Sequence, residues 1–172
     1  MKKRKILLAV MCLALIACTT SQIILTLNVA SMAISAAPAV LGGISNIPPA
    51  TMADIKAGLS AAATALSAAA TDLDSGAITP VEIAAISTQL VTALTQLNAV
   101  QQGLPPTARA AIQAVIAGVD AFMALWQRQG ANLMATTGGP TSYKMHLSWK
   151  DKRDLGSCKT QLQQALAAVG KL

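Results

Sequence analysis

The nine residues ITPVEIAAI at positions 78–86 decide the fold, because the same pattern occurs three times along the chain. Residues 47–55 (IPPATMADI) and 104–112 (LPPTARAAI) align with it without gaps. Each copy has proline near its start, and proline suits the first turn of a helix, where N–H groups lack intrahelical partners. In the middle copy Thr79 and Glu82 also have the spacing of a capping box. Each copy therefore predicts the start of a helix.

Apolar residues extend the alignment beyond each start. Counted from the isoleucine that ends each copy, they recur at +4, +7 and +11, which places them on one face of a helix. They are Leu59, Ala62 and Leu66 in the first copy, Leu90, Ala93 and Leu97 in the second, and Ile116, Val119 and Met123 in the third. The pattern predicts helices at 50–72, 80–102 and 106–129, antiparallel because their connections are short. Ancestral duplication and three unrelated helices with the same start rules explain the repeat equally well.

The chain is apolar but poor in aromatic rings. Of its 172 residues 53% are hydrophobic and only 2% aromatic, so alanine and aliphatic side chains must form most of the core. Ala57, Ala61, Ala65 and Ala69 recur every fourth residue. Such a strip lets another backbone approach closely, either in a soluble bundle or between membrane helices. The charged residues on the same segment favour the soluble bundle.

The residues on either side of the repeat predict further elements. Residues 23–41 are expected to form a helix buried against the bundle, with a second membrane contact as the alternative. Glycine and threonine at 130–142 predict a loop. Residues 143–149 alternate apolar and polar, which suits either a strand paired with residues 23–29 or another chain, or an extended loop. A last helix is expected at 150–170, with one apolar face formed by Leu155, Leu162, Leu166 and Val169.

These elements together define the fold class. We predict an all-α protein, an antiparallel bundle of about four to five helices after an N-terminal apolar segment. A loop or short extended segment is expected near residues 130–150.

The N-terminus has the parts of an export signal. Residues 1–5 are basic and residues 6–17 are apolar, a run of twelve that is shorter than the about 20 residues needed to span a membrane. The run ends in Leu15, Ile16, Ala17 and Cys18. These four residues resemble the lipobox of bacterial lipoproteins, a family in which a diacylglyceryl group is added to the cysteine and the peptide is cut before it. The resemblance implies a signal peptide at 1–17, a lipid-anchored apolar segment at 18–46 and a bundle domain at 47–172.

The resemblance covers about the first twenty residues, so it implies a location rather than an activity. It makes membrane lipid the partner of the N-terminus and palmitate a component of the anchor. Thr19, which follows the cysteine, is similar to outer-membrane lipoproteins of diderm bacteria and implies the periplasmic side of that membrane. The alternative is an uncleaved signal anchor, because no charged residue occurs from Ile6 to Ala53. An integral protein, holin-like or pore-forming, would then hold residues 6–41 in the bilayer.

Charge argues against nucleic acid as a partner. The formal charge is +6, but four of the 13 basic residues precede Ile6, which leaves nine basic and seven acidic residues after cleavage. A nucleic-acid surface would need a basic face with stacking aromatic rings. We expect no nucleic-acid partner.

Few residues suit catalysis or metal binding. His146 is the only histidine and Glu82 the only glutamate, which excludes histidine-rich zinc sites. No flanking motif supports a thiol–imidazole pair of Cys158 with His146. Asp72 and Asp74 fit a turn that ends a helix better than a cation site. We expect no catalytic residue, no metal and no cofactor.

Two further groups have a structural and a functional interpretation. Cys158 would be the one thiol left after cleavage and lipidation, since Cys12 lies in the signal stretch. It is expected to be a small buried side chain, with a mixed or intermolecular disulfide as the alternative. The run from Lys150 to Asp154 suits a solvated helix start, with a lipid-phosphate site as the alternative.

The aromatic residues lie close together in the sequence. We expect them to form the bulkiest part of the core, and the alternative is a patch that binds a protein partner or a second copy. They are Phe122, Trp126, Tyr143 and Trp149. The sequence thus favours a membrane-anchored lipoprotein with a structural, scaffolding or binding role.

Overall fold

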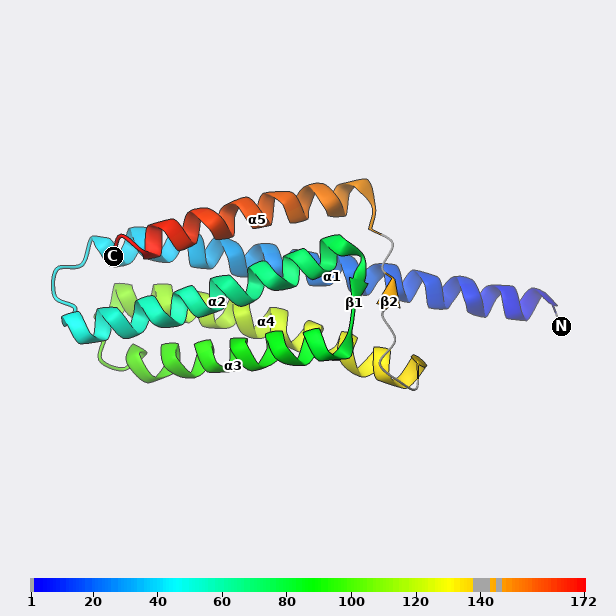
Figure 1. Ribbon diagram of the computed structural model, residues 1–172, viewed down its shortest axis with the longest axis horizontal. Helices are drawn as coiled ribbons and strands as arrows, with labels where there is room; N and C mark the ends of the chain where they lie inside the picture. The colour runs from blue at the N-terminus through cyan, green and yellow to red at the C-terminus, as the bar shows by residue number, and fades with distance from the viewer. Residues whose placement is uncertain (1, 138–142, 145–146) are drawn as a thin grey trace.

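The computed structural model describes the backbone of residues 2–137, 143–144 and 147–172, and the side chains of residues 20–132 and 147–172. The chain forms long helices joined by short connections (Figure 1). In order, the elements are α1 (Lys2–Gly42), α2 (Pro49–Ser75), β1 (Ala77–Ile78), α3 (Pro80–Gln101), α4 (Pro106–Thr137), β2 (Tyr143–Lys144) and α5 (Trp149–Val169). The predicted all-α bundle is confirmed.

The five helices form a closed ring around one core. Helix α1 packs against α4 and α5, α2 packs against α3 and α5, and α3 packs against α4. The order around the ring is therefore α1, α4, α3, α2, α5. Helices that follow each other in sequence run in opposite directions (Figure 1). Because the ring has an odd number of members, one neighbouring pair must be parallel, and that pair is α1 and α5.

The helices begin where the repeat predicts. The backbone N–H of Thr79 donates to Glu82 Oε2 at 2.7 Å, and the N–H of Glu82 donates back to Thr79 Oγ1 at 3.3 Å, which completes the capping box. Helix α2 begins at Pro49 and α4 at Pro106. Gly76 ends α2 with φ of 70°, a left-handed conformation that glycine adopts without steric cost.

The repeated apolar stripe forms the centre of the ring. On α2 and α3 every member of the stripe is buried. On α4 Val119 is buried, but Ile116 and Met123 are only half-buried. Their neighbours Val115 and Phe122 are the buried core residues of this helix instead. The alanine strip of α2 is buried only towards the C-terminal end of the helix: Ala65 and Ala69 are buried, whereas Ala57 is exposed.

Residues 23–41 form the predicted buried helix. They lie within α1, and their inner face is fully buried at Leu27, Ile34 and Leu41. Pro38 lies inside this helix without ending it, and α1 stops at Gly42. This stretch therefore supplies core residues to the same ring as the repeat helices.

The predicted loop at 130–142 is wrong for its first eight residues. Helix α4 continues to Thr137, past the expected end at residue 129. Gly130 does not end the helix but lies against α3, where a Cβ atom would come within 2.9 Å of Ile83 Cγ2. The glycine is explained by close packing rather than by a turn. Residues 138–142 lie outside the described residues.

The short extended segment predicted near residues 130–150 is confirmed, but the strand does not extend over 143–149. Strand β2 has two residues, and α5 already begins at Trp149. Its antiparallel partner is β1, with Ala77 opposite Lys144 and Ile78 opposite Tyr143. Residues 23–29 are not the partner, because they are helical. Met145 and His146 lie outside the described residues.

Candidate functional site

The residues that resemble a lipobox lie at the start of the described bundle. Leu15, Ile16, Ala17 and Cys18 fall within α1, and their side chains lie outside the described part of the chain. Thr20, two residues after Cys18, is buried at 6% exposure. From Ile23 onward α1 contributes regularly to the core. The packed part of α1 thus begins within one or two helical turns of Cys18.

A polar seam joins this helix to α5. Ser31 Oγ lies 2.8 Å from the carbonyl oxygen of Asn28 and 2.9 Å from Gln161 Oε1. Ser35 Oγ donates to the carbonyl oxygen of Ser31 at 2.7 Å. Ser31 is fully buried, so these bonds offset the cost of taking its hydroxyl out of water. No charged base adjoins either serine among these contacts, and the seam fixes how the two parallel helices pack.

Cys158 lies in the same seam and is a buried free thiol. Its Sγ donates to the carbonyl oxygen of Leu27 at 3.9 Å. Burial raises the pKa of the Cys158 thiol, and a hydrogen bond from Ser31 only partly opposes that effect. A buried thiol with a raised pKa is a weak nucleophile, because the thiolate is the reactive form. The expected buried side chain is confirmed, while the suggested partner His146 lies outside the described residues.

The four aromatic residues do not form one surface. Phe122 and Trp126 are fully buried and stacked, with ring centroids 5.4 Å apart. For these two the core interpretation is confirmed and the partner-binding patch is wrong. Trp149 is 76% exposed at the start of α5, and the side chain of Tyr143 lies outside the described part.

The charged run at the start of α5 is exposed, which both interpretations of it require. Ser148 and Asp151 form a capping box, in which Asp151 Oδ2 accepts from the backbone N–H and the hydroxyl of Ser148. Lys150 and Lys152 are exposed. The Arg153 guanidinium lies 5.1 Å above the ring of Trp149.

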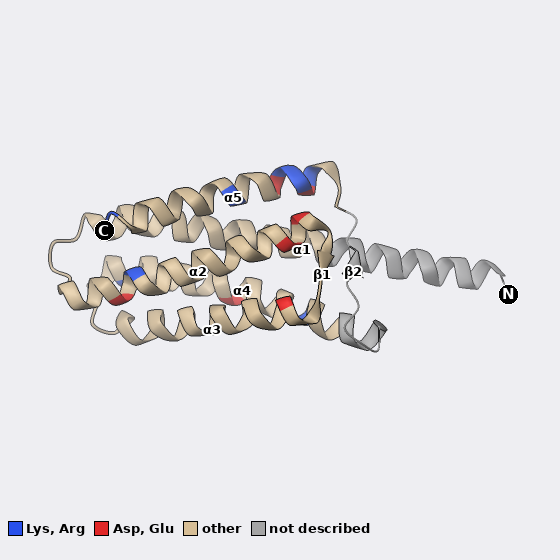
Figure 2. Ribbon diagram, in the orientation of Figure 1, with Lys and Arg blue, Asp and Glu red and all other residues tan. Residues whose placement is uncertain are grey.

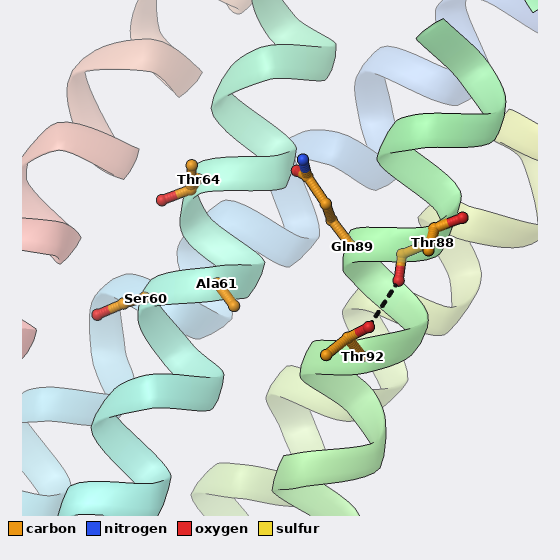
Figure 3. A pocket seen from close by; sticks show the side chains of 6 residues that line it. All are labelled: Ser60, Ala61, Thr64, Thr88, Gln89 and Thr92. Atoms are coloured by element: carbon orange, nitrogen blue, oxygen red, sulfur yellow. Dashed lines mark hydrogen bonds between the residues drawn. The ribbon is translucent and has the colours of Figure 1, made fainter. Parts of the chain in front are cut away.

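A shallow groove lies between α2 and α3. It encloses about 380 Å³ and is lined by small or neutral side chains. In Figure 3 Gln89 reaches from α3 towards α2, while Thr92 Oγ1 donates to the carbonyl oxygen of Thr88 at 3.0 Å. None of the lining residues is ionisable: Ser60, Ala61, Thr64, Thr88, Gln89 and Thr92. The groove offers hydrogen bonds but no acid, base or nucleophile pair for catalysis.

The two aspartates at the end of α2 have different surroundings. Asp74 Oδ2 pairs with Lys159 Nζ of α5 at 2.7 Å. Partial burial raises the pKa of the Asp72 carboxyl, and the negative charge of Glu82 raises it further. Asp72 also lies near the negative end of the α2 dipole. The two aspartates thus lie at the end of the helix, as the sequence indicates. Folding disfavours the ionised form of the Asp72 carboxyl.

Replacing Asp72 with asparagine is expected to stabilise the protein at neutral pH. The pKa of Asp72 is higher in the folded than in the unfolded chain. The free energy of unfolding therefore falls as pH rises from the unfolded pKa of 3.8 through the raised pKa of the folded chain. The D72N variant should unfold at a higher temperature than wild type at pH 7, and the two should converge below pH 3.8. Circular dichroism melts between pH 3 and pH 7 measure this. The control Asp74→Asn should lower the midpoint slightly at pH 7, because it loses the Lys159 pair; a D72N midpoint below wild type would contradict the assignment.

Charge is unevenly distributed around the ring (Figure 2). Within the described side chains, α2 and α5 carry most charged residues, and α1 carries none. Three helical segments are long and apolar enough to cross a membrane, judged by length and composition: Thr20–Gly42, Pro80–Gln101 and Pro106–Asn132. They belong to α1, α3 and α4, which are neighbours in the ring. The bundle therefore has a charge-rich side and a charge-poor side.

Comparison with known proteins identifies no relative: no protein family, curated protein or solved structure matches this chain. Within the described residues no group of three or more histidine, cysteine, aspartate or glutamate side chains is placed to hold a metal ion.

Two contacts were not predicted from the sequence: the seam of Ser31, Ser35 and Gln161, and the contact of Arg153 with Trp149. Only the spacing could have indicated them, since Ser31 and Ser35, like Trp149 and Arg153, are one helical turn apart.

Proposed function

We propose that this chain is a bacterial lipoprotein that holds a five-helix bundle at a membrane surface. The signal peptide at 1–17 is removed, Cys18 carries the lipid, and the bundle has a structural, scaffolding or binding role rather than a catalytic one. Thr19 favours the periplasmic side of the outer membrane in a diderm source.

One observation carries this proposal. The lipobox-like residues end at Cys18, and α1 is packed into the bundle from Thr20 and Ile23 onward. Cleavage before Cys18 therefore leaves all five helices with their described core residues. The lipid would lie at the first residue of a helix that is packed into the core. A force on the lipid anchor would then act on the whole bundle through α1.

The chemistry of the described side chains is consistent with a role without catalysis. The Cys158 thiol is buried with a raised pKa, and Ser31 is fixed by hydrogen bonds. The groove between α2 and α3 is lined by neutral residues. A binding or scaffolding role needs only the surface and the anchor.

An integral membrane protein is the second candidate, and the three long apolar segments favour it. One feature weighs against insertion of all three segments. Helix α4 exposes Asp120 and Arg128, and a charge near the bilayer centre costs roughly 3 kcal/mol on insertion scales. Large exposed apolar side chains gather on α1 at Leu25, Val29, Met32 and Val40, so the described surface favours a membrane contact of α1 over one of α4.

Mass spectrometry of the native product tests the proposal. We expect a polypeptide that begins at Cys18, heavier than the bare chain by a diacylglyceryl group and its acyl chains. The intact chain with Met1 or Lys2 at its N-terminus and an unmodified Cys18 would refute the lipoprotein and support the integral candidate.

A further inference from the structure

Trp149 is exposed in an unusual setting. It is 76% exposed, the largest value among the exposed large hydrophobic side chains of the described chain. The other described tryptophan, Trp126, is fully buried. Arg153, one turn further along α5, lies 5.1 Å from the Trp149 ring centroid, so the ring is held in a cation–π contact and not in the core.

The basic side chains around this ring are free to meet a negatively charged surface. Lys150, Lys152 and Arg153 are exposed, whereas Asp151 and Asp154 are only half-exposed. Asp151 accepts hydrogen bonds from Ser148 and so completes the capping box. Asp154 lies 3.8 Å from Arg153, which is a long contact for an ion pair. The N-terminal amides of α5 are already capped, so the surface consists of side chains.

The parallel packing of α1 and α5 places this surface next to the anchor. Leu27 contacts Cys158 and Ser31 contacts Gln161, at sequence separations of 131 and 130. A Cβ on Gly42 would contact Leu172, at the same separation. Subtracting this offset from the first residue of α5 puts Trp149 at the level of Cys18 and Thr19 on α1.

We propose that Trp149, Lys150, Lys152 and Arg153, here called the α5 patch, form a second membrane contact that binds the headgroup layer of anionic phospholipids. The inference rests on the proposed lipid anchor at Cys18. Tryptophan prefers the membrane–water interface, where its ring is partly apolar and its N–H stays wet. Lysine and arginine near an anionic surface each strengthen binding about fivefold. The anchor and the α5 patch would hold the bundle at two points and so fix its orientation.

Fluorescence quenching in vesicles tests this. The native protein, with its lipid, is reconstituted into phosphatidylglycerol/phosphatidylcholine vesicles with and without brominated acyl chains, and only the fraction that floats with the vesicles is measured. Trp126 is buried in the core, so the Trp149→Phe variant reports its emission alone. We expect brominated lipid to remove most of the emission that distinguishes wild type from W149F, and to leave the W149F emission nearly unchanged.

Charge variants test the role of the basic side chains. The combined Lys150→Gln, Lys152→Gln and Arg153→Gln change should lower the quenching of Trp149 to the level that wild type shows in pure phosphatidylcholine. Lys171→Gln is the matched control, because Lys171 is exposed two residues beyond the other end of α5. It should leave the quenching unchanged, and 1 M salt should reduce wild-type quenching through screening.

Each other outcome overturns the proposal in a distinct way. If the chain floats but Trp149 is quenched by aqueous iodide and not by brominated lipid, the α5 patch faces water while the anchor stands. If Trp149 is protected from both quenchers, the patch contacts protein, such as a second copy. If the native chain does not float, the anchor and the patch are both refuted.

Discussion

Cys18→Ser is expected to abolish incorporation of labelled palmitate and to leave a precursor that is 17 residues longer than the mature chain. The thiolate is the stronger nucleophile, and a serine hydroxyl does not replace it as the acceptor of the diacylglyceryl group. A lipid with several chains gives lasting attachment at about 0.8 kcal/mol per buried CH₂, whereas one chain binds only marginally. The variant should therefore lose both its label and its maturation.

Label and size are the decisive measurements, because fractionation alone misleads here. An uncleaved precursor keeps the apolar stretch at 6–17 and would still sediment with membranes. Cys12→Ser is the matched control: it makes the same chemical change within the signal stretch and should mature and incorporate label like wild type. A Cys18→Ser protein that still incorporates palmitate and reaches mature size would refute the anchor.

The helix starts could be predicted from sequence because their causes are local. The Thr79 and Glu82 side chains bond to backbone groups three residues away, and the proline starts of α2 and α4 need no tertiary partner. The apolar stripe is equally local on α2 and α3, since its period decides which face is buried. For these elements periodicity and capping agree with the structure.

The errors concern features that depend on other helices. Gly130 resembles a helix end in sequence, but contact with Ile83 of α3 explains it. Strand β2 pairs with β1, two residues that lie about 65 positions earlier and have no alternating pattern. The parallel α1–α5 pair follows from closing a ring of five, which no single segment encodes. Long-range packing decided each of these outcomes.

The aromatic residues of the candidate site have two different environments. Phe122 and Trp126 lie in the core, as the sequence predicts, and their spacing of one helical turn lets their rings stack. Trp149 is flanked by Ser148, Lys150 and Asp151 and is exposed, because Leu155, Cys158 and Leu162 form the buried face of α5 on the other side of the helix. The apolar face predicted for residues 150–170 already excludes position 149, so the exposure of this ring could be read from the helical period.

Gly118→Leu is expected to cause the largest loss of stability. Gly118 lies where α4 crosses α1, and a Cβ atom there would come within 3.0 Å of the Cα atom of Ala30. Backbone cannot rotate away as a side chain can, so a leucine must push the two helices apart. Overpacking of this kind costs about 3 kcal/mol, which lowers the melting temperature of a chain of this size by about 6–12 °C.

The control is the same substitution where space is open. Gly156 is an exposed residue of α5, and a Cβ atom there meets nothing within 4 Å. Gly156→Leu should raise stability by about 0.5–1 kcal/mol, because leucine forms helix better than glycine. Thermal melts of the full-length variants in detergent, read by near-ultraviolet circular dichroism of Phe122 and Trp126, compare the two. A Gly118→Leu protein as stable as wild type would show that α1 does not pack on α4, and the anchor would then pull on a free helix rather than on the bundle.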